Sequence, residues 1–318
     1  MSSLFIIGNG FDVAHGIPTT YNDFRKWVIN EYPDSIAFRD ETISLEEYGN
    51  LPVDVVAAET LVYAMDHASG EEWNDFEDAL SNINFLHKIP RLPEAKENEP
   101  ESEHNNRVTS HLLMIDELSS AIIKSAEEYW SLFFSDWIKT VEEKIEGDNY
   151  KVHNSLFQLF SDSTNQYMNF NYTKTLQNLY GVSVVKHIHN RVGQNLVFGH
   201  GDLKAEYEEP YESDVRMTIG SSDFNDFIQS FRKDTDRQIR KYSKFFKNLD
   251  SSIDKVYSYG FSYSKVDSPY IKLVIDKISP NTTWYFTEFE TKNAESLRIK
   301  KIRLRKYGFK GSFGSFIG

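Results

Sequence analysis

The sequence predicts an α/β fold, in which a Rossmann-like, mostly parallel sheet carries a large helical insertion after its first strand. Short apolar segments rich in β-forming residues alternate with helix-patterned stretches, as they do where crossover helices join parallel strands. Between residues 34 and 150 no convincing strand pattern occurs. We therefore expect a Rossmann-like nucleotide-binding domain formed by residues 1–33 and 151–318, and a helical insertion subdomain formed by residues 34–150.

The expected strands are short apolar segments, most of them in the second half of the chain. They cover residues 3–8, 166–171, 183–189, 196–199, 255–260, 282–288 and 298–305. The last segment partly alternates basic and apolar residues, which predicts a strand with one basic face. Two roles fit that face: lysines that block strand addition at a sheet edge, or a contact with an anionic partner or ligand.

The expected helices are recognised by apolar residues at helical spacing. One helix is expected from Tyr21 to Glu31, after a capping box that begins at Thr20. One or two helices are expected over residues 110–146, and further helices over Lys174 to Tyr180 and Tyr270 to Ile278. Another helical stripe consists of Trp73, Phe76, Leu80 and Ile83. Two segments rich in polar and acidic residues, Pro90 to Asn106 and Asp202 to Asp214, are expected to be loops.

Composition narrows the functional classes. The net charge of −13 argues against a general nucleic-acid-binding surface, so no nucleic-acid partner is expected. No apolar run approaches the roughly 18 residues that span a bilayer, and the first apolar run lacks the basic flank of a signal peptide. Cysteine is absent, which excludes disulfides, thiolate zinc sites and a cysteine nucleophile. We expect a cytoplasmic protein with no membrane partner.

The first expected strand breaks into Gly8-Asn9-Gly10-Phe11-Asp12 and leads towards His15-Gly16-Ile17-Pro18. A strand that ends in glycines before a helix exposes backbone N–H groups beside a helix N-terminus, where phosphate binds readily. The spacing is not that of the dinucleotide fingerprint, because the third glycine is Gly16, six residues after Gly10. A tight turn that needs glycine for steric reasons alone explains the pattern equally well.

Asn169-Phe170-Asn171-Tyr172-Thr173 follows the second expected strand. Ligands of open α/β sheets bind beyond the carboxyl ends of the strands, so the amide and hydroxyl groups of this turn are candidates for ligand binding. The alternative is a helix N-cap, in which Asn171 or Thr173 satisfies free backbone donors.

Histidines follow at the end of the next expected strand. His187 and His189 are two residues apart and would share a face of a strand, and His200 and Asp202 come shortly afterwards. The four side chains could hold a metal ion without any cysteine. A single histidine acting as a general base is equally compatible with the pattern, and no metal site is assigned.

A third strand-to-glycine turn runs from Tyr259 through Gly260 to Ser262, and Asp267 precedes the next expected helix. Gly260 and Ser262 would present further donors at a helix start. Three such turns at strand ends, with a histidine nearby, predict a nucleotide cleft.

Taken together, these motifs resemble the AbiH-like family of bacteriophage abortive-infection proteins. The resemblance runs nearly end to end, and it is carried by Ile6 to Asp12 with His15-Gly16, Trp73 with Phe76-Glu77, Asn169 to Thr173, His187-Ile188-His189, and Gly260-Phe261-Ser262 with Asp267. It implies a role in anti-phage defence.

The order of the motifs also resembles, more distantly, that of sirtuin-like NAD-binding domains. That resemblance implies that the first loop, from Gly8 to Gly10 and on to Gly16-Ile17-Pro18, wraps the cofactor. It implies that Asn171 holds the nicotinamide ribose, that His189 is the base, and that Gly260 with Ser262 meets the far end of the dinucleotide.

Three departures from the sirtuin pattern bear on the chemistry. Thr173 stands where sirtuins carry the Asp that helps fix the nicotinamide amide, and Asn190 stands where a glycine follows the base. Asp12 replaces a serine of the first loop; an anion there is awkward beside a pyrophosphate and could instead face the ribose or a water. Sirtuin deacylases also carry a four-cysteine zinc module, so peptide deacylation is not expected.

The leading hypothesis is hydrolysis of NAD or a related nucleotide at the N-glycosidic bond, with Asn171, His189 and Asp12 as catalytic residues. The expected nucleotide-binding residues are Gly8, Asn9, Gly10, Phe11, His15, Gly16, Asn169, Tyr172, Thr173, Gly260, Ser262 and Asp267. No tightly bound cofactor is expected, because NAD would be the substrate or ligand. A phage trigger, a partner protein and a homo-oligomer are all compatible with this hypothesis. The alternatives are a non-catalytic nucleotide sensor that acts through a partner, and a metal-dependent nuclease or phosphohydrolase.

Overall fold

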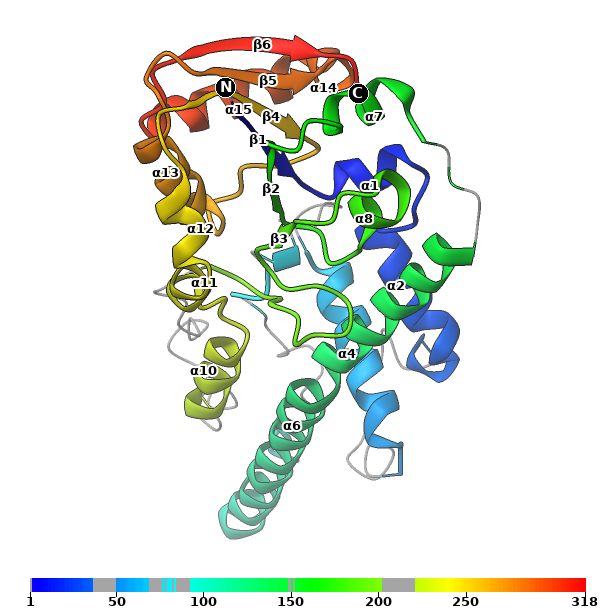
Figure 1. The fold of residues 1–318 in the computed structure, drawn as a ribbon. Coiled ribbons are helices and arrows are strands. Elements are labelled where there is room, and N and C mark those ends of the chain that lie inside the picture. Colours follow the sequence, from blue (N-terminus) through cyan, green and yellow to red (C-terminus); the bar gives the residue numbers. More distant parts are fainter. Residues whose placement is uncertain are drawn as a thin grey trace. The chain divides into compact units, whose positions relative to one another are not determined.

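The computed structural model describes residues 2–36, 50–68, 76–77, 79–81, 83, 92–147, 150, 152–201 and 221–318 (Figure 1). The chain divides into two compact units. The sheet unit comprises Met1–Thr20, Ser135–Gly201 and Lys233–Gly318, and the insertion unit comprises Tyr21–Phe134 and Asp202–Arg232.

The sheet unit is built on six parallel strands in the order β3-β2-β1-β4-β5-β6. Their bounds are β1 Ser2–Ile7, β2 Gln166–Asn169, β3 Lys186–His187, β4 Ile253–Tyr259, β5 Thr283–Thr287 and β6 Ser312–Phe316. The order reverses between β1 and β4, which lie side by side, and this is the position where doubly wound sheets bind ligands. The predicted Rossmann-like α/β fold is therefore confirmed.

Helices cover both faces of the sheet because alternate strand residues point to opposite sides. Leu4 and Ile6 of β1 lie in one core cluster, and Phe5 and Ile7 lie in the other. The first cluster includes residues of α12 (Ser243–Asn248), α13 (Ser268–Lys277) and α15 (Ala294–Lys306). The second includes residues of α1 (Gly10–Ala14), α7 (Asn154–Phe160) and α8 (Thr175–Tyr180). The strand residues are consequently apolar on both faces, as in parallel sheets generally.

The remaining helices of the sheet unit are α11 (Thr235–Lys241), α14 (Glu288–Thr291) and the carboxyl-terminal part of α6 (Glu101–Gly147). Helix α6 is 47 residues long, and its residues up to Phe134 belong to the insertion unit. The predicted helix over 110–146 is thus a single helix that begins nine residues earlier.

The described part of the insertion unit contains α2 (Tyr21–Glu31), a short 3-10 helix η1 (Pro33–Ile36), α4 (Val53–Asp66), α10 (Ser221–Ser230) and the first part of α6. Trp130 of α6 is completely buried, and its indole N–H donates to the Ala57 carbonyl of α4 at 2.9 Å. None of the described helices combines the length and the apolar character that crossing a membrane requires.

Several sequence-based expectations about elements are wrong. Residues 298–305 form part of helix α15, not a strand, because Asn293 caps the helix by accepting from the Ser296 N–H and Arg, Lys and Leu favour helix over strand. Residues 196–199 form no strand, and β3 is only two residues long. Residues 101–106, expected in a loop, open α6 directly after Pro100.

Strand β6 was not anticipated, because Ser-Phe-Gly-Ser-Phe is short and rich in small residues. Two other expectations concern residues outside the described ranges: the loop from Asp202 to Asp214, and Trp73 of the helical stripe.

Candidate functional site

The glycines at the ends of β1 and β4 pack directly against each other. A Cβ atom on Gly8 would lie 2.6 Å from the Gly260 carbonyl oxygen, and one on Gly260 would lie 2.4 Å from the Gly10 Cα. Gly260 also has a φ of +63°, which disfavours other residues. Gly8 N–H donates to the Tyr259 carbonyl at 2.9 Å and Gly10 N–H to the Gly260 carbonyl at 3.1 Å. These two N–H groups are therefore occupied, and close packing of two loops accounts for the glycines.

Asp12 lies in α1, just beyond the carboxyl end of β1, and is 1% exposed. Its Oδ2 accepts a hydrogen bond of 2.6 Å from the Thr173 hydroxyl, which also lies 3.0 Å from the Thr175 hydroxyl. Its Oδ1 is buried and has no hydrogen-bond partner among the described residues, and the same holds for Nδ2 of Asn171. An unbonded acceptor and an unbonded donor thus lie buried at the ends of β1 and β2.

Burial raises the pKa of Asp12 to about 6, because an ion in an apolar interior loses its hydration. The Thr173, Thr175 and Asn171 side chains oppose this increase by stabilising the charged form. The nearby charge of Glu142 raises the pKa further. Asp12 is therefore a carboxyl group that exchanges a proton near neutral pH, which is the property required of a general base or acid.

Glu142 of α6 joins this group through α8. It accepts hydrogen bonds from the Lys174 N–H at 2.9 Å and from the Asn178 amide at 2.8 Å, and the Lys174 ammonium lies 3.3 Å away. A carboxylate at the N-terminus of a helix satisfies free backbone donors and interacts favourably with the helix dipole. Glu142 thus holds the segment that carries Thr173 and Thr175. We call Asp12, Asn171, Thr173, Thr175 and Glu142 the Asp12 group.

His189 belongs to a second buried group. Its Nε2 lies 3.0 Å from Oδ1 of Asp267, an ion-pair contact in which the ring N–H is not aligned for a hydrogen bond. The Ser264 hydroxyl donates to the other Asp267 oxygen at 3.3 Å. Burial lowers the pKa of His189, and so does the nearby Lys233, whereas Asp267 raises it. We call His189, Asp267, Ser264 and Lys233 the His189 group.

The turn after β2 separates the two groups. Phe170 and Tyr172 pack on His189, with ring centroids 5.3 Å and 6.1 Å from the imidazole. Thr173 bonds to Asp12, and the Asn171 amide lies close enough to stabilise the Asp12 carboxylate. Of the three proposed catalytic residues, Asn171 and Asp12 therefore belong to one group and His189 to the other.

Two histidines have both ring nitrogens engaged. His187 Nδ1 lies 3.0 Å from the Asn171 carbonyl and its Nε2 lies 2.8 Å from the Gln177 amide. Burial lowers the His187 pKa to about 4, which keeps the ring neutral. His15 bonds the Phe11 carbonyl at 2.7 Å and the Tyr180 hydroxyl at 2.6 Å, and burial lowers its pKa also. These contacts give His187 and His15 roles in holding the loops together.

His200 is buried, whereas Asp202 lies outside the described residues. Within the described ranges, no three His, Asp or Glu side chains gather in a way that could hold a metal ion.

The other predicted residues of the first loop make local contacts. The Asn9 amide donates to the Thr19 carbonyl at 2.9 Å, and Phe11 is buried with its ring 5.2 Å from that of Tyr259. Gly16 adopts a φ of +77° in the turn that follows α1. These contacts fix the path of the loop around Asp12.

The predicted residues of the later turns are also held in place. Asn169 Oδ1 accepts from the Asn171 N–H at 2.9 Å, and the Tyr172 hydroxyl donates to the Val197 carbonyl at 2.9 Å. The Ser262 carbonyl accepts from Arg303 of α15 at 3.1 Å, and the Ser262 side chain is half-buried. Together these bonds rigidify the carboxyl edge of the sheet.

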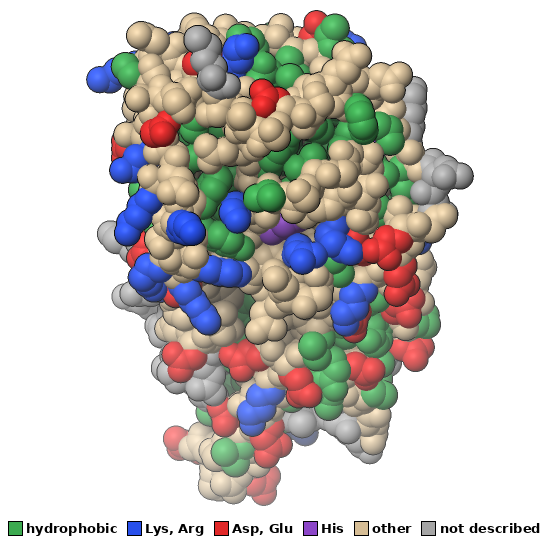
Figure 2. Space-filling view, in the orientation of Figure 1, with side chains coloured by type: hydrophobic (Ala, Val, Ile, Leu, Met, Phe, Trp, Pro, Cys, Tyr) green, Lys and Arg blue, Asp and Glu red, His purple; other side chains and the backbone are tan. Residues whose placement is uncertain are grey.

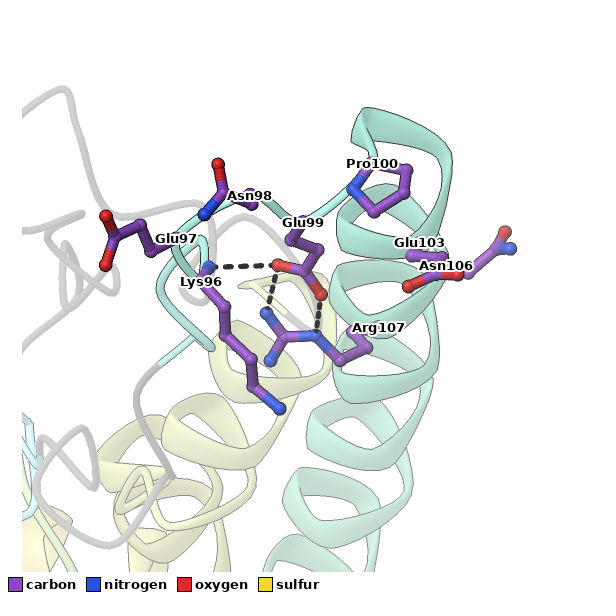
Figure 3. Close-up of a pocket in the computed structure, with 8 residues that line it drawn as sticks. All are labelled: Lys96, Glu97, Asn98, Glu99, Pro100, Glu103, Asn106 and Arg107. Carbon is purple, nitrogen blue, oxygen red and sulfur yellow. Dashed lines mark hydrogen bonds and ion pairs between the residues drawn. The ribbon is translucent and has the colours of Figure 1, made fainter.

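An open pocket of about 480 Å³ lies elsewhere, beside the start of α6 in the insertion unit (Figure 3). Arg107 binds Glu99 through two hydrogen bonds of 2.6 Å and 2.7 Å, and these bonds lower the Glu99 pKa to about 2. None of the sequence-predicted site residues lines this pocket.

Sequence reasoning missed four residues of the two groups: Thr175, Glu142, Ser264 and Lys233. Thr175 stands two residues after Thr173 and is brought to the Asp12 group by its contact with the Thr173 hydroxyl. Ser264 carried a usable signal, because it stands three residues before Asp267 at the start of a helix, the spacing of a capping pair. Glu142 and Lys233 carried none, since each lies in a charged surface-type segment and becomes buried only through tertiary packing.

Comparison with known proteins identifies the family. Searches of curated proteins and of solved structures gave no match. The family model described as "Bacteriophage abortive infection AbiH" matches residues 4–288, a span that contains both buried groups. The chain therefore belongs to the AbiH family of bacteriophage abortive-infection proteins.

Proposed function

We propose that this AbiH protein hydrolyses the N-glycosidic bond of NAD or a related nucleotide, and that the resulting loss of the nucleotide arrests growth of the infected cell. The observation that carries the proposal is the juxtaposition of Asp12 and Asn171. Each has a buried polar atom without a partner among the described residues, and the Asp12 pKa is raised to about 6. Buried unsatisfied groups of this kind at a strand end are typical of a ligand or reaction site.

The reaction needs little from the protein. The bond between the ribose C1′ and the nicotinamide nitrogen breaks, its electron pair leaves with neutral nicotinamide, and the ribose becomes an oxocarbenium ion. A water oxygen then bonds to C1′ and gives up a proton. The ionised Asp12 carboxylate would stabilise the cation and accept that proton, and the Asn171 amide would donate to the water or to a ribose hydroxyl.

His189 has a separate role in this scheme. Its lowered pKa keeps the ring neutral near pH 7, and Asp267 beside Nε2 favours the tautomer protonated at that nitrogen. The other nitrogen, Nδ1, would then accept a hydrogen bond from a substrate hydroxyl. The resemblance to sirtuin-like domains assigns the base to His189, whereas the contacts favour Asp12, and variants of each residue separate the two assignments.

Substrate binding requires a local opening, because Asp12 and His189 are 1% and 3% exposed. The negative charge of an ionised Asp12 attracts the cationic nicotinamide ribose and repels a phosphate. The proposal therefore places the nicotinamide end of NAD, not the pyrophosphate, beside Asp12.

The direct test is to incubate the purified protein with NAD and to follow nicotinamide and ADP-ribose by chromatography, with and without a lysate of phage-infected cells. We expect nicotinamide release by the wild type and a loss of at least 100-fold in Asp12→Asn. Asp250→Asn is the matched control, because Asp250 is an exposed aspartate of the same unit. Release at the wild-type rate by Asp12→Asn, or no release under any condition, would overturn the proposal.

The sensor hypothesis gives a different result in the same samples. Calorimetry that detects NAD or ADP-ribose binding, weakened in Asn171→Ala, without any nicotinamide release would favour a non-catalytic nucleotide sensor acting through a partner.

A further inference from the structure

Charge is distributed very unevenly between the two units. The sheet unit carries 24 Lys and Arg against 16 Asp and Glu, a net charge of +8, although the whole chain has a charge of −13. The insertion unit carries 11 Lys and Arg against 32 Asp and Glu, a net charge of −21. Whole-chain charge therefore conceals a basic unit, and charge asymmetry of this size is typical of proteins with a polyanionic partner.

Part of the basic charge has structural uses. On α15, Arg298 pairs with Glu295 and Lys300 pairs with Glu290. Arg303 binds the carbonyls of the turn after β4, and Arg305 binds the Phe309 carbonyl and lies over the Phe313 ring. The basic cluster that the sequence places at 298–305 is thus largely engaged within the sheet unit.

The basic residues of α11 and α12 differ. They recur at three- and four-residue intervals and are all exposed, and we call them the basic stripe: Arg237, Arg240, Lys241, Lys244 and Lys247. This spacing puts them on one face of the nearly continuous helical segment. Among the described residues, no acidic side chain forms an ion pair with any of them. Figure 2 shows Lys and Arg side chains gathered over α11 and α12, at the left of the view.

The stripe is anchored beside the candidate site. The Tyr242 hydroxyl, between the two helices, donates to the His187 carbonyl at 2.6 Å. The Lys241 ammonium donates to the Asn190 side chain, in the turn directly after His189. The stripe therefore borders the carboxyl end of β3.

We propose that the basic stripe binds the phosphodiester backbone of a single nucleic-acid strand. Its cations lie within an eleven-residue segment, whose ends are about 15 Å apart along the helix, and this is enough to follow three or four successive phosphates. This length exceeds what one pyrophosphate needs. A membrane surface fits less well, because the opposite helix face carries Phe245, Phe246 and Leu249, which are buried in the sheet core and offer no apolar residues to a bilayer.

This inference does not depend on NAD hydrolysis, and binding is its readout. The probe is a fluorescein-labelled 20-nucleotide single-stranded RNA, measured by anisotropy from 50 to 200 mM NaCl. We expect affinity to fall with salt, with a slope of about −2 for three phosphate contacts. The double variant Arg240→Glu/Lys244→Glu should bind at least tenfold more weakly at 50 mM NaCl and lose more than half of the slope.

The matched control is Lys306→Glu/Lys310→Glu, which makes the same charge change at exposed positions of the same unit. It should bind RNA within threefold of the wild type, and circular dichroism checks the folding of both variants. An equal loss of RNA affinity in the two double variants would overturn the proposal, because the change in net charge alone would then explain the loss. Absence of RNA binding at 50 mM NaCl, or binding to phosphatidylserine vesicles in place of RNA, would overturn it as well.

Discussion

Thr173 donates a hydrogen bond of 2.6 Å to the buried carboxylate of Asp12 across 161 positions of the sequence. This bond joins the helix after β1 to the turn after β2. It leaves the second Asp12 oxygen without a hydrogen-bond partner in the described residues, next to the similarly unbonded Asn171 amide. The resulting arrangement of an acceptor, a donor and a pKa near 6 underlies the first predictions.

The first prediction concerns the pH dependence of NAD hydrolysis. If Asp12 is the base, kcat/KM should fall about tenfold per pH unit below about pH 6, as the Asp12 carboxylate becomes protonated. Rates of nicotinamide release from pH 4.5 to 8.5 measure this. A profile that does not change across pH 6, in protein shown to remain folded, would contradict the assignment of Asp12.

The second prediction concerns stability. Because the pKa of Asp12 is raised in the folded state, the folded protein binds more protons than the unfolded chain between about pH 4 and pH 6, and stability falls as pH rises through this window. Asp12→Asn removes this penalty, and its amide can still accept the Thr173 bond. We compare the unfolding free energy of the variant with that of the wild type by urea denaturation at pH 4 and pH 7. The difference between variant and wild type should shift in favour of the variant by up to about 3 kcal/mol from pH 4 to pH 7.

The third prediction has the opposite sign. The pKa of His187 is lowered to about 4, so the unfolded chain binds more protons between about pH 4 and pH 6.5, and stability is lost as pH falls through this window. In His187→Gln, the decrease in unfolding free energy on going to low pH should be smaller than in the wild type by as much as about 3 kcal/mol. Urea denaturation at pH 7 and pH 4.5 measures it, and an unchanged difference between the two pH values would refute it.

The fourth prediction tests the interlocked glycine loops. Gly260→Ala would place a Cβ atom 2.4 Å from the Gly10 Cα and would also strain a positive φ, so we expect a loss of at least about 3 kcal/mol in unfolding free energy. Gly181→Ala is the control, because its φ is +68° and nothing lies within 4 Å of the new Cβ. It should cost only about 1 kcal/mol. Similar losses in the two variants would show that loop packing is not the reason for Gly260.

The fifth prediction concerns the His189 group. If Asp267 acts by orienting His189, the variants Asp267→Asn and His189→Ala should each reduce kcat for NAD hydrolysis, and the double variant should be no slower than His189→Ala. Asp267→Asn should also lower the His189 pKa further, since Asp267 raises it. Histidine NMR titration measures that pKa, and multiplicative losses in kcat would show that the two residues act separately.

The sequence by itself determined the class of fold and the position of most elements. Strands β1, β2, β4 and β5 were predicted within a few residues, because buried parallel strands have short, continuous apolar runs that few other structures need. The glycine and asparagine turns after these strands were found by the same local reasoning. The basic segment 298–305 was misassigned because its partial alternation resembles a strand, whereas helix propensity and the Asn293 cap favour the helix.

Only the tertiary structure decided which of these turns lie together. Asp12 and Thr173 meet because β1 and β2 pair in parallel and end at the same edge of the sheet. The pKa of Asp12 is raised by its burial in the folded chain and by the charge of Glu142, which is 130 positions away in the sequence. The sequence left open whether the N–H groups of Gly8 and Gly10 face a phosphate or belong to a tight turn, and in the structure they donate to the carbonyls of Tyr259, at the end of β4, and Gly260. Local patterns specify backbone conformation, whereas neighbours, burial and charge at a site depend on how distant segments pack.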